Sequence, residues 1–197
     1  MFILNLILFI LVLGVIILIH ELGHFFFAKR AKILCHEFSI GMGPAIYQKR
    51  KGETIYSIRG IPIGGYVSMA GESINDALIK KGMVVGIHLN SNGVIDEIIL
   101  HENATPTQIG SVIDFDLYGK NMGDLFLTMD IQGDIQTYPV LRDAKYVISE
   151  KRSMWITPAE KSFESKALWQ RFLVIFAGPL MNFILALLLF LIVGFFM

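Results

Sequence analysis

Two long apolar stretches, one near each end of the chain, limit the folds open to this sequence more than any other feature. They cover residues 2–28 and 172–196. Each exceeds the ~20 apolar residues with which an α-helix crosses a bilayer. The chain is also 54% hydrophobic and only 17% charged, a balance typical of membrane proteins rather than of soluble domains. We therefore expect two transmembrane helices.

The basic residues predict how the chain crosses the membrane. All 17 Lys and Arg lie between the two apolar stretches. Because basic residues beside a span stay in the cytoplasm, we expect a cytoplasmic connecting segment, outward chain ends and a multi-pass protein of the plasma membrane. A cleaved signal peptide fits the first stretch poorly, since no basic residue precedes it and its far end carries histidines. The net charge of zero gives no reason to expect a nucleic-acid partner.

Composition divides the chain into four parts. Residues 1–28 form the first transmembrane helix, and residues 166–197 contain the second. Between them, residues 29–72 are rich in glycine and in β-branched or aromatic side chains, whereas residues 73–165 are more polar. We expect β-structure in both middle parts, and we interpret the second as a small β-rich insert.

Short strands and turns are predicted within these two middle parts. In the first part, turns are expected at residues 41–44, 51–52 and 62–65. In the second part, the strand-like segments are residues 84–89, 94–100, 125–131 and 146–148, and the sequence NSNG at residues 90–93 predicts a hairpin turn.

The motif HELGH, residues 20–24, lies inside the first apolar stretch. His20 and His24 are four residues apart, so on a helix they project from one face, as two ligands of one metal ion do. Zinc binds neutral imidazole and lowers the pKa of a bound water to about 7, and Glu21 is placed to take a proton from that water. Gly23 leaves room for another backbone or a substrate.

The depth of the motif favours a metal site over a structural role. Glu21 precedes Lys29 by eight residues, which is about 12 Å along a helix. An unpaired ionisable group at such a depth costs at least ~2.5 kcal/mol. The alternative is that these side chains cap the helix or pair with polar groups of a bundle. For the single histidines His36, His88 and His101 we expect surface or structural roles, and for Cys35 the role of a small, inert residue, with metal binding as the alternative.

Three stretches carry a family resemblance. They are "HELGHFFFAKRAKILCHEFSIGMGP", "ETIYSIRGIPIGGYVSMAGE" and "WQRFLVIFAGPLMNFILALLLF". In this order they resemble the front half of a site-2 protease, and more narrowly the regulator-of-sigma-E-protease group in its Gram-positive form. The resemblance covers roughly residues 1–72 and 160–197, and the part between is variable in that group.

This resemblance implies an intramembrane zinc metalloprotease with its active site near the cytoplasmic side. His20 and His24 match the two histidine ligands, and Glu21 matches the catalytic base. Gly41 and Gly43 match the glycine pair of a membrane-dipping β-hairpin that holds the substrate as an added strand. Asn182 matches a polar position facing the site, although hydrogen bonding between helices explains it equally well.

The expected fold class is therefore membrane α-helical, with two transmembrane helices, membrane-associated β-hairpins and a small β-rich cytoplasmic insert. One departure from the family stands out. Its members take a third zinc ligand from the aspartate of an LDG motif on a later helix, and no LDG occurs in this sequence. We accordingly expect the N-terminal portion of such an enzyme, whether fragment, truncation or split half, with a C-terminal half carrying that aspartate as a partner.

Three functions are compatible with these residues. The leading one is cleavage of the transmembrane segment of a single-pass protein, such as an anti-sigma factor or a signal-peptide remnant, within the lipid bilayer. The second is a non-catalytic partner that binds membrane helices, or an inactive fragment without the third ligand. The third is a surface-exposed zinc protease that uses Glu160 or Glu164 as its third ligand, which the position of the motif inside an apolar stretch disfavours.

Overall fold

In the computed structural model the chain forms two compact units. Unit 1 contains Met1–Glu72 and Lys166–Met197, and unit 2 contains Ser73–Ser165. The structure describes residues 1–72, 77–101, 104–119, 123–150 and 152–196. Unit 1 holds the HELGH motif, Gly41, Gly43 and Asn182, whereas the alternative ligands Glu160 and Glu164 belong to unit 2.

Two helices, one from each end of the chain, dominate unit 1. α1 spans Phe2–Arg30 and α2 spans Leu168–Phe196. Both are long and apolar enough to cross a membrane, and most of their large apolar side chains are exposed, which suits contact with lipid. The two apolar helices predicted from the sequence are confirmed. α2 begins four residues before the predicted stretch, because the helix also includes the more polar Leu168–Arg171 turn.

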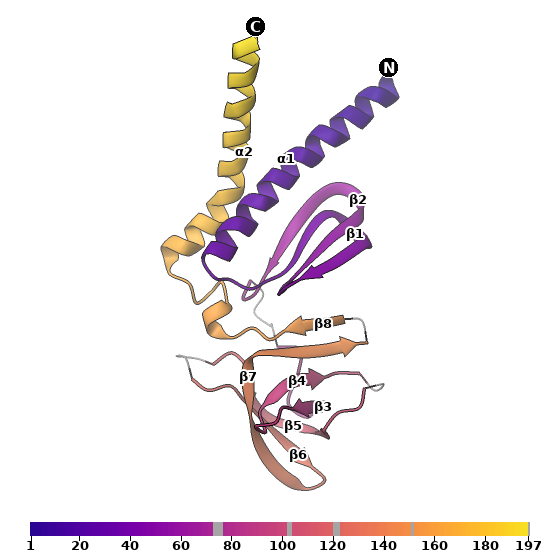
Figure 1. Cartoon of the computed structure of the whole chain (residues 1–197), viewed down its shortest axis with the longest axis vertical. Coiled ribbons are helices and arrows are strands. Elements are labelled where there is room, and N and C mark those ends of the chain that lie inside the picture. Colours follow the sequence, from indigo (N-terminus) through magenta and orange to yellow (C-terminus); the bar gives the residue numbers. More distant parts are fainter. Residues whose placement is uncertain (73–76, 102–103, 120–122, 151, 197) are drawn as a thin grey trace. The chain divides into compact units, whose positions relative to one another are not determined.

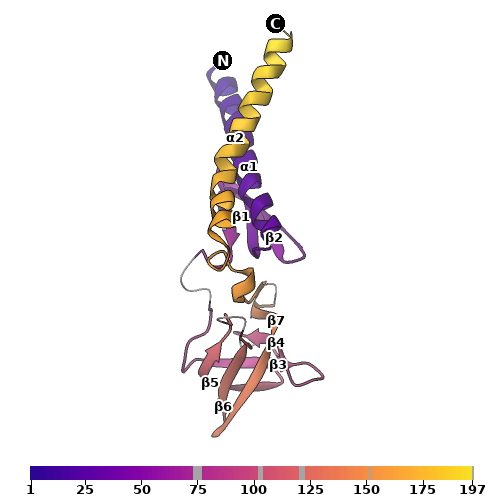
Figure 2. The ribbon, with the colours of Figure 1, turned by 90° about the vertical axis from the view of Figure 1, so that its left-hand side faces the viewer.

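The helices run in opposite directions (Figures 1 and 2). They approach each other closely at small residues. A side-chain carbon added at Gly23 of α1 would lie 2.5 Å from the carbonyl oxygen of Ala177 and 2.8 Å from Cγ of Met181. The close approach predicted at Gly23 is therefore made by the backbone of α2. Pro179 lies inside α2 and cannot donate a backbone hydrogen bond, and the helix changes direction in its first half (Figure 1).

Unit 1 also contains a small sheet, which contacts α1. β1 (Cys35–Lys51) and β2 (Thr54–Met69) pair antiparallel through the turn at residues 52–53. Both strands continue through the stretches 41–44 and 62–65, where the sequence predicts turns between short strands. Phe38 nevertheless pairs with both Tyr56 and Val67, and Tyr56 also pairs with Lys49.

Each strand must therefore bend back on itself, as the curved ribbons show (Figure 1). Four segments lie side by side in the order 45–51, 54–59, 35–40 and 65–69. Gly41 and Gly43 allow the first bend, because their φ angles of +83° and +80° are rarely adopted by other residues. The strand pairing continues around the glycines, where separate short strands were predicted.

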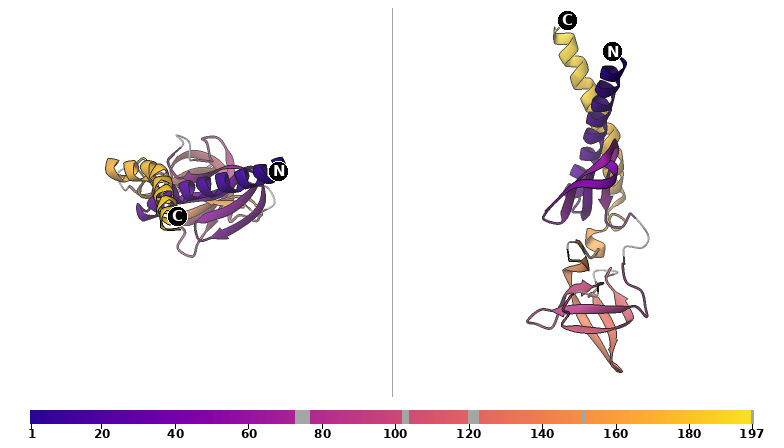
Figure 3. Two further views of the ribbon diagram at one scale, coloured as in Figure 1. Left: turned by 90° about the horizontal axis from the view of Figure 1, so that it is seen from above. Right: turned by 90° about the vertical axis from the view of Figure 1, so that its right-hand side faces the viewer.

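The sheet lies along the C-terminal half of α1 (Figure 3, right). Its apolar face meets the helix at Phe25, whose ring is 5.2 Å from that of Phe38 and 5.9 Å from that of Tyr56. Lys29 of α1 pairs with Glu53, at the turn, over 3.6 Å. The turn thus lies beside the basic end of α1, and the opposite end of the sheet reaches toward the middle of the helix.

The described residues of unit 2 form six strands. Their bounds are β3 Val84–Leu89, β4 Ile95–Ile99, β5 Gln108–Asp116, β6 Phe126–Ile131, β7 Asp134–Ser149 and β8 Arg152–Trp155. The strand order is β4-β3-β5-β6-β7-β8, and parallel pairing of β4 with β7 closes five of them into a barrel (Figure 2). A short 3₁₀ helix, Ala159–Lys161, follows.

Apolar side chains fill this barrel, with Ile87, Ile95, Ile98, Leu127 and Met129 fully buried. The β-rich middle predicted from the sequence is confirmed. Asn90 accepts hydrogen bonds from the backbone of Asn92 and Val94, which explains the turn after β3. β7 is much longer than the predicted segment 146–148. The first half of β7 is polar in sequence, which hid it from prediction, and pairing with β6 holds it as a strand.

We predict that Gly23→Ile separates the two helices, whereas Gly14→Ile leaves them together. Both glycines lie in α1, but nothing lies within 4 Å of a carbon added at Gly14. Overpacking of this kind typically costs about 1–3 kcal/mol. Thermal unfolding of the two variants in detergent, followed by circular dichroism, should show a lower midpoint for Gly23→Ile alone. Equal midpoints would contradict the close approach.

Candidate active site

The two motif histidines meet between α1 and α2. Their Nε2 atoms are 3.2 Å apart and their rings stand edge to face. Two neutral imidazoles that point lone pairs at each other over this distance repel unless a proton or a cation lies between them. In a tetrahedral zinc site with bonds of about 2.05 Å, two ligand nitrogens lie about 3.3 Å apart, so the pair fits the predicted metal.

The carbonyl oxygen of Val174 fixes the orientation of His24. It lies 2.7 Å from Nδ1 of His24. A carbonyl oxygen only accepts, so Nδ1 carries the proton and Nε2 of the neutral ring keeps its lone pair. A metal-binding histidine usually donates its other ring N–H to a carbonyl or carboxylate in this way.

Asn182 of α2 lies beside His20, with its amide group 3.2 Å from Nδ1. The Asn182 Oδ1 atom is buried and lacks a hydrogen-bond partner, while Nδ2 faces the ring. Exchanging the amide oxygen and nitrogen lets Oδ1 accept the Nδ1 proton and leaves the Nε2 lone pair free. The buried oxygen thus has a natural partner if His20 binds a metal through Nε2.

Gly178 forms the wall of α2 against both rings. A carbon added there would lie 2.3 Å from Nε2 of His24 and 2.7 Å from Nε2 of His20. No side chain fits at this position without moving the imidazoles. Gly178 was not predicted from the sequence, although its four-residue spacing from Asn182 places both on one face of α2.

The histidine pair offers two potential metal ligands. Across the parts of the chain that the structure describes, no group of three or more His, Cys, Asp or Glu side chains could hold a metal ion. Glu160, one alternative third ligand, accepts two hydrogen bonds from Arg142 at 2.8 Å within unit 2. Burial raises the pKa of the Cys35 thiol to about 11, which fits the predicted inert role of this cysteine.

Glu21 lies between the histidines and the sheet. A carbon added at Gly65 of β2 would be 3.1 Å from Cγ of Glu21 and 2.8 Å from the carbonyl oxygen of Ser39. Gly65 therefore gives the carboxylate its space, and it too was missed by sequence analysis. The outer segment 65–69 of the sheet begins at this contact.

Gly41 and Gly43 lie in the bend of β1 rather than within one of its paired segments. A carbon added at Gly41 would be 2.6 Å from the carbonyl oxygen of Ile61, and one at Gly43 would be 3.1 Å from the Ile61 side chain. The structure thus gathers His20, Glu21, His24 and Asn182 at one place and puts the two glycines at the end of the adjoining sheet.

The polar face of the sheet carries a compact charged cluster. The Glu37 carboxylate accepts hydrogen bonds from Ser57, Arg59 and Tyr66, and Nη2 of Arg59 is 2.7 Å from it. Burial opposes the charged form of Glu37, but these hydrogen bonds outweigh it and hold its pKa below the ordinary range. Burial, and then the bond to Glu37, raise the pKa of Tyr66 to about 12.

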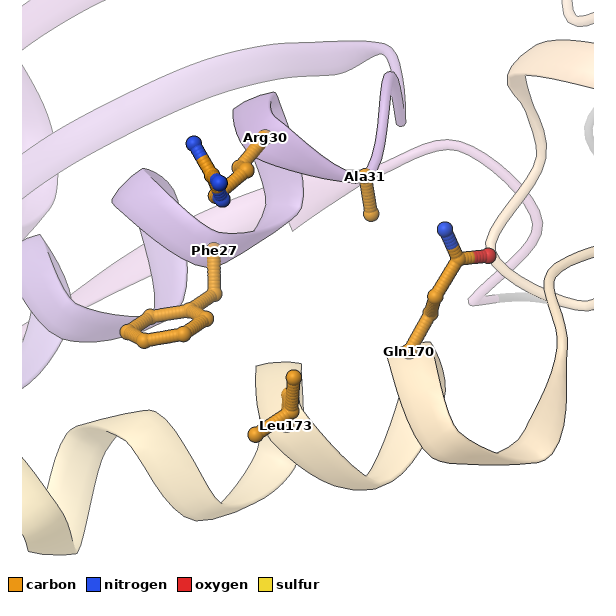
Figure 4. Close-up of a pocket in the computed structure, with 5 residues that line it drawn as sticks. All are labelled: Phe27, Arg30, Ala31, Gln170 and Leu173. Carbon is orange, nitrogen blue, oxygen red and sulfur yellow. The ribbon is translucent and has the colours of Figure 1, made fainter.

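A pocket of about 320 Å³ opens elsewhere in unit 1 (Figure 4). Phe27, Arg30 and Ala31 line it from the end of α1, and Gln170 and Leu173 line it from the start of α2. None of these is a predicted site residue, so the pocket is separate from the histidine pair.

Comparison with known proteins places the chain in a family. Residues 8–197 match the family described as peptidase family M50. The chain belongs to peptidase family M50. The resemblance to site-2 proteases drawn from the three sequence stretches is thereby confirmed.

Two relatives illustrate the match to M50 peptidases. Zinc metalloprotease RasP of Geobacillus kaustophilus is 38% identical over 188 residues, which cover 94% of this chain and 44% of the relative. Zinc metalloprotease RasP of Shouchella clausii is 40% identical over 181 residues, covering 90% of this chain and 42% of the relative. The chain thus spans less than half the length of these curated relatives.

We predict that acid weakens unit 1 through Glu37. Because its pKa is lowered in the folded chain, Glu37 stabilises the fold above its ordinary pKa, and this contribution is lost as pH falls through the lowered value, below about 4.5. Thermal unfolding of wild type and Glu37→Gln between roughly pH 6 and pH 3 should give curves that converge in acid. Curves that stay parallel would contradict the assignment.

Proposed function

We propose that this chain is the metal-binding portion of an intramembrane zinc metalloprotease. The observation that carries the proposal is the pair of Nε2 atoms of His20 and His24, 3.2 Å apart in an apolar helix. Each ring has a polar neighbour for its other nitrogen, Val174 for His24 and Asn182 for His20. Membership of the M50 family and relatives named zinc metalloproteases support it.

His20 and His24 would hold the zinc ion through Nε2, and further ligands would come from outside the described residues. Zinc, when bound, lowers the pKa of water and polarises a carbonyl group. Val174 and Asn182 keep the rings in the tautomer that binds metal, and Gly178 keeps space free in front of them. The aspartate of an LDG motif on a C-terminal half is the ligand expected from the family.

Glu21 acts as general base. It adjoins the histidine pair in sequence and lies beside Gly65, where no side chain competes for space. Its carboxylate takes a proton from the attacking water and delivers it to the amine that leaves when the peptide bond breaks.

The sheet presents the substrate. A transmembrane helix satisfies its own amide groups, so it must unwind before cleavage, and an open strand edge can supply replacement hydrogen bonds. The outer segment 65–69 pairs with β1 on one side and begins beside Glu21, which supports strand addition there. Gly41 and Gly43, the glycine pair that matches the family, shape the bend that ends the sheet.

The substrate is the transmembrane segment of a single-pass membrane protein, such as an anti-sigma factor or a signal-peptide remnant. Exposed apolar side chains at the bends of the sheet support immersion of this end in lipid; they are Ile40, Met42, Ile46, Ile61 and Ile63. The antiparallel helices and the basic residues between them support a multi-pass plasma-membrane protein with unit 2 in the cytoplasm.

A second candidate is a non-catalytic partner that binds membrane helices. The absence of a cluster of three potential metal ligands from the described residues favours it. Glu21 favours the protease, because a protein that only binds helices has no need of a base.

We predict that the purified chain binds zinc weakly, through the histidine pair. Elemental analysis after equilibration with zinc should find metal in wild type and in His88→Ala, and little in His20→Ala/His24→Ala. His88 is a suitable control because it pairs with Asp96 on the surface of unit 2. Equal metal content in all three proteins would rule out the site.

Glu21→Gln should abolish cleavage while zinc and substrate still bind. Loss of a general base typically costs about 10²–10⁴-fold in rate. The variant is expressed with a model single-pass substrate and the later helix of a relative, and cleavage is followed by gel electrophoresis. Glu150→Gln, an exposed carboxylate in unit 2, is the control. Near wild-type cleavage by Glu21→Gln would show that another group is the base.

We predict that Phe2 is accessible from outside the cell and Asn92 is not. Single cysteines at these exposed positions, in a chain with Cys35 replaced by Ala, are treated with a membrane-impermeant maleimide. The Asn92 site should react only after the membrane is permeabilised. Labelling of Asn92 in intact cells would overturn the cytoplasmic placement of the insert.

A further inference from the structure

Arg59 is the one charged residue in the two stretches that form the bends of the sheet, residues 40–47 and 58–66. Its neighbours along the chain are largely apolar, and four-fifths of the Arg59 side chain is shielded from solvent. A charge in such surroundings is retained only with partners. The partners of Arg59 identify what it does.

The two ends of the Arg59 guanidinium hold different groups. Nη1 donates to the carbonyl oxygen of Gly43 over 2.6 Å, and Nη2 donates to Glu37 over 2.7 Å. Glu37 also accepts a hydrogen bond from Ser57, which directs its carboxylate toward Arg59. The planar fork of arginine matches this double task, whereas the single ammonium group of lysine does not.

The same guanidinium also reaches the outer segment of the sheet. It lies 5.2 Å from the centre of the Tyr66 ring, and Tyr66 hydrogen-bonds to Glu37. Tyr66 follows Gly65, the residue against which Glu21 lies. Arg59 therefore links the glycine bend to the strand segment beside the catalytic centre.

We propose that Arg59, held by Glu37, is a positioning residue that sets the glycine bend and the 65–69 edge for substrate capture. This inference rests on the proposed function, because it assigns Arg59 to the substrate-binding surface of that site. Arg59 touches neither the histidines nor Glu21. Its loss should weaken capture and raise KM while kcat and zinc content stay near wild type.

Two variants separate the double hydrogen bonding of Arg59, to Gly43 and Glu37, from its ion pair with Glu37. Arg59→Lys keeps the charge but cannot serve Gly43 and Glu37 together. The exchange Glu37→Arg/Arg59→Glu keeps opposite charges facing each other, but a carboxylate at position 59 cannot donate to the carbonyl of Gly43. Arg142→Lys is the matched control, because Arg142 also bonds a glutamate, Glu160, and a glycine carbonyl, Gly123, but within unit 2.

The full chain is tested in membranes with a single-pass substrate that carries a photoreactive residue in its transmembrane segment. Capture is measured by crosslinking in the Glu21→Gln background, and hydrogen exchange by mass spectrometry reports on residues 41–44 and 65–69 without substrate. We expect both Arg59 variants to lose about tenfold or more in capture and to exchange faster in both segments, with Arg142→Lys unchanged. Wild-type capture by the exchanged pair, or by Arg59→Lys, would overturn the proposal.

The outcome also separates this proposal from the proposed function. If wild type, expressed with the later helix of a relative, captures substrate but never cleaves it, the protease assignment fails and the dependence of capture on Arg59 still stands. If wild type captures no substrate, the proposed function is wrong. The hydrogen-exchange rate of residues 41–44 then decides whether Arg59 positions the glycine bend. Unchanged exchange in Arg59→Lys would then disprove it.

Discussion

The structure of unit 1 depends on one constraint: a polar group inside an apolar helix must find a partner within the protein. His24 finds the carbonyl oxygen of Val174, and His20 lies beside Asn182. Both partners belong to α2, at the opposite end of the sequence. The need to satisfy two histidines thus holds the first and last segments of the chain together, and it leaves both Nε2 atoms facing the same point.

Close packing of backbone makes this pairing possible. Gly23 lets α1 approach Ala177, and Gly178 gives both imidazoles room against α2. On another side of α1, Gly65 brings the sheet up to Glu21. Three glycines from three elements therefore meet here, Gly23 within the HELGH motif and Gly65 and Gly178 beside it, and at each of them a side chain would collide with a neighbour. Substitutions at these positions should disturb the site as strongly as changes to the polar residues.

The sheet solves a similar problem by a different route. Its apolar face packs on Phe25, and its opposite face gathers Glu37, Ser57, Arg59 and Tyr66 into one hydrogen-bonded cluster. Burying a paired and hydrogen-bonded charge costs free energy, and removing one of its partners costs considerably more. Such a cluster therefore specifies one arrangement of the strands. The proposed role of Arg59 follows from the fact that this arrangement includes the carbonyl of Gly43.

The sequence by itself determined the features that depend on local pattern. Apolar length predicted both helices, the i, i+4 spacing put His20 and His24 on one face, and turn chemistry predicted the bend after β3. Only the tertiary structure decided that Val174 and Gly178 complete the site, because they lie about 150 residues from the motif and come to it through helix packing. Asn182 was expected there from the family resemblance, and the structure places it beside His20. The tertiary structure also decided that β1 and β2 bend without ending, since a glycine with positive φ can either stop a strand or carry its pairing around a corner. The difference is physical: local propensity acts within a few residues, whereas contacts across the fold are chosen by packing and by the need to pair every buried polar group.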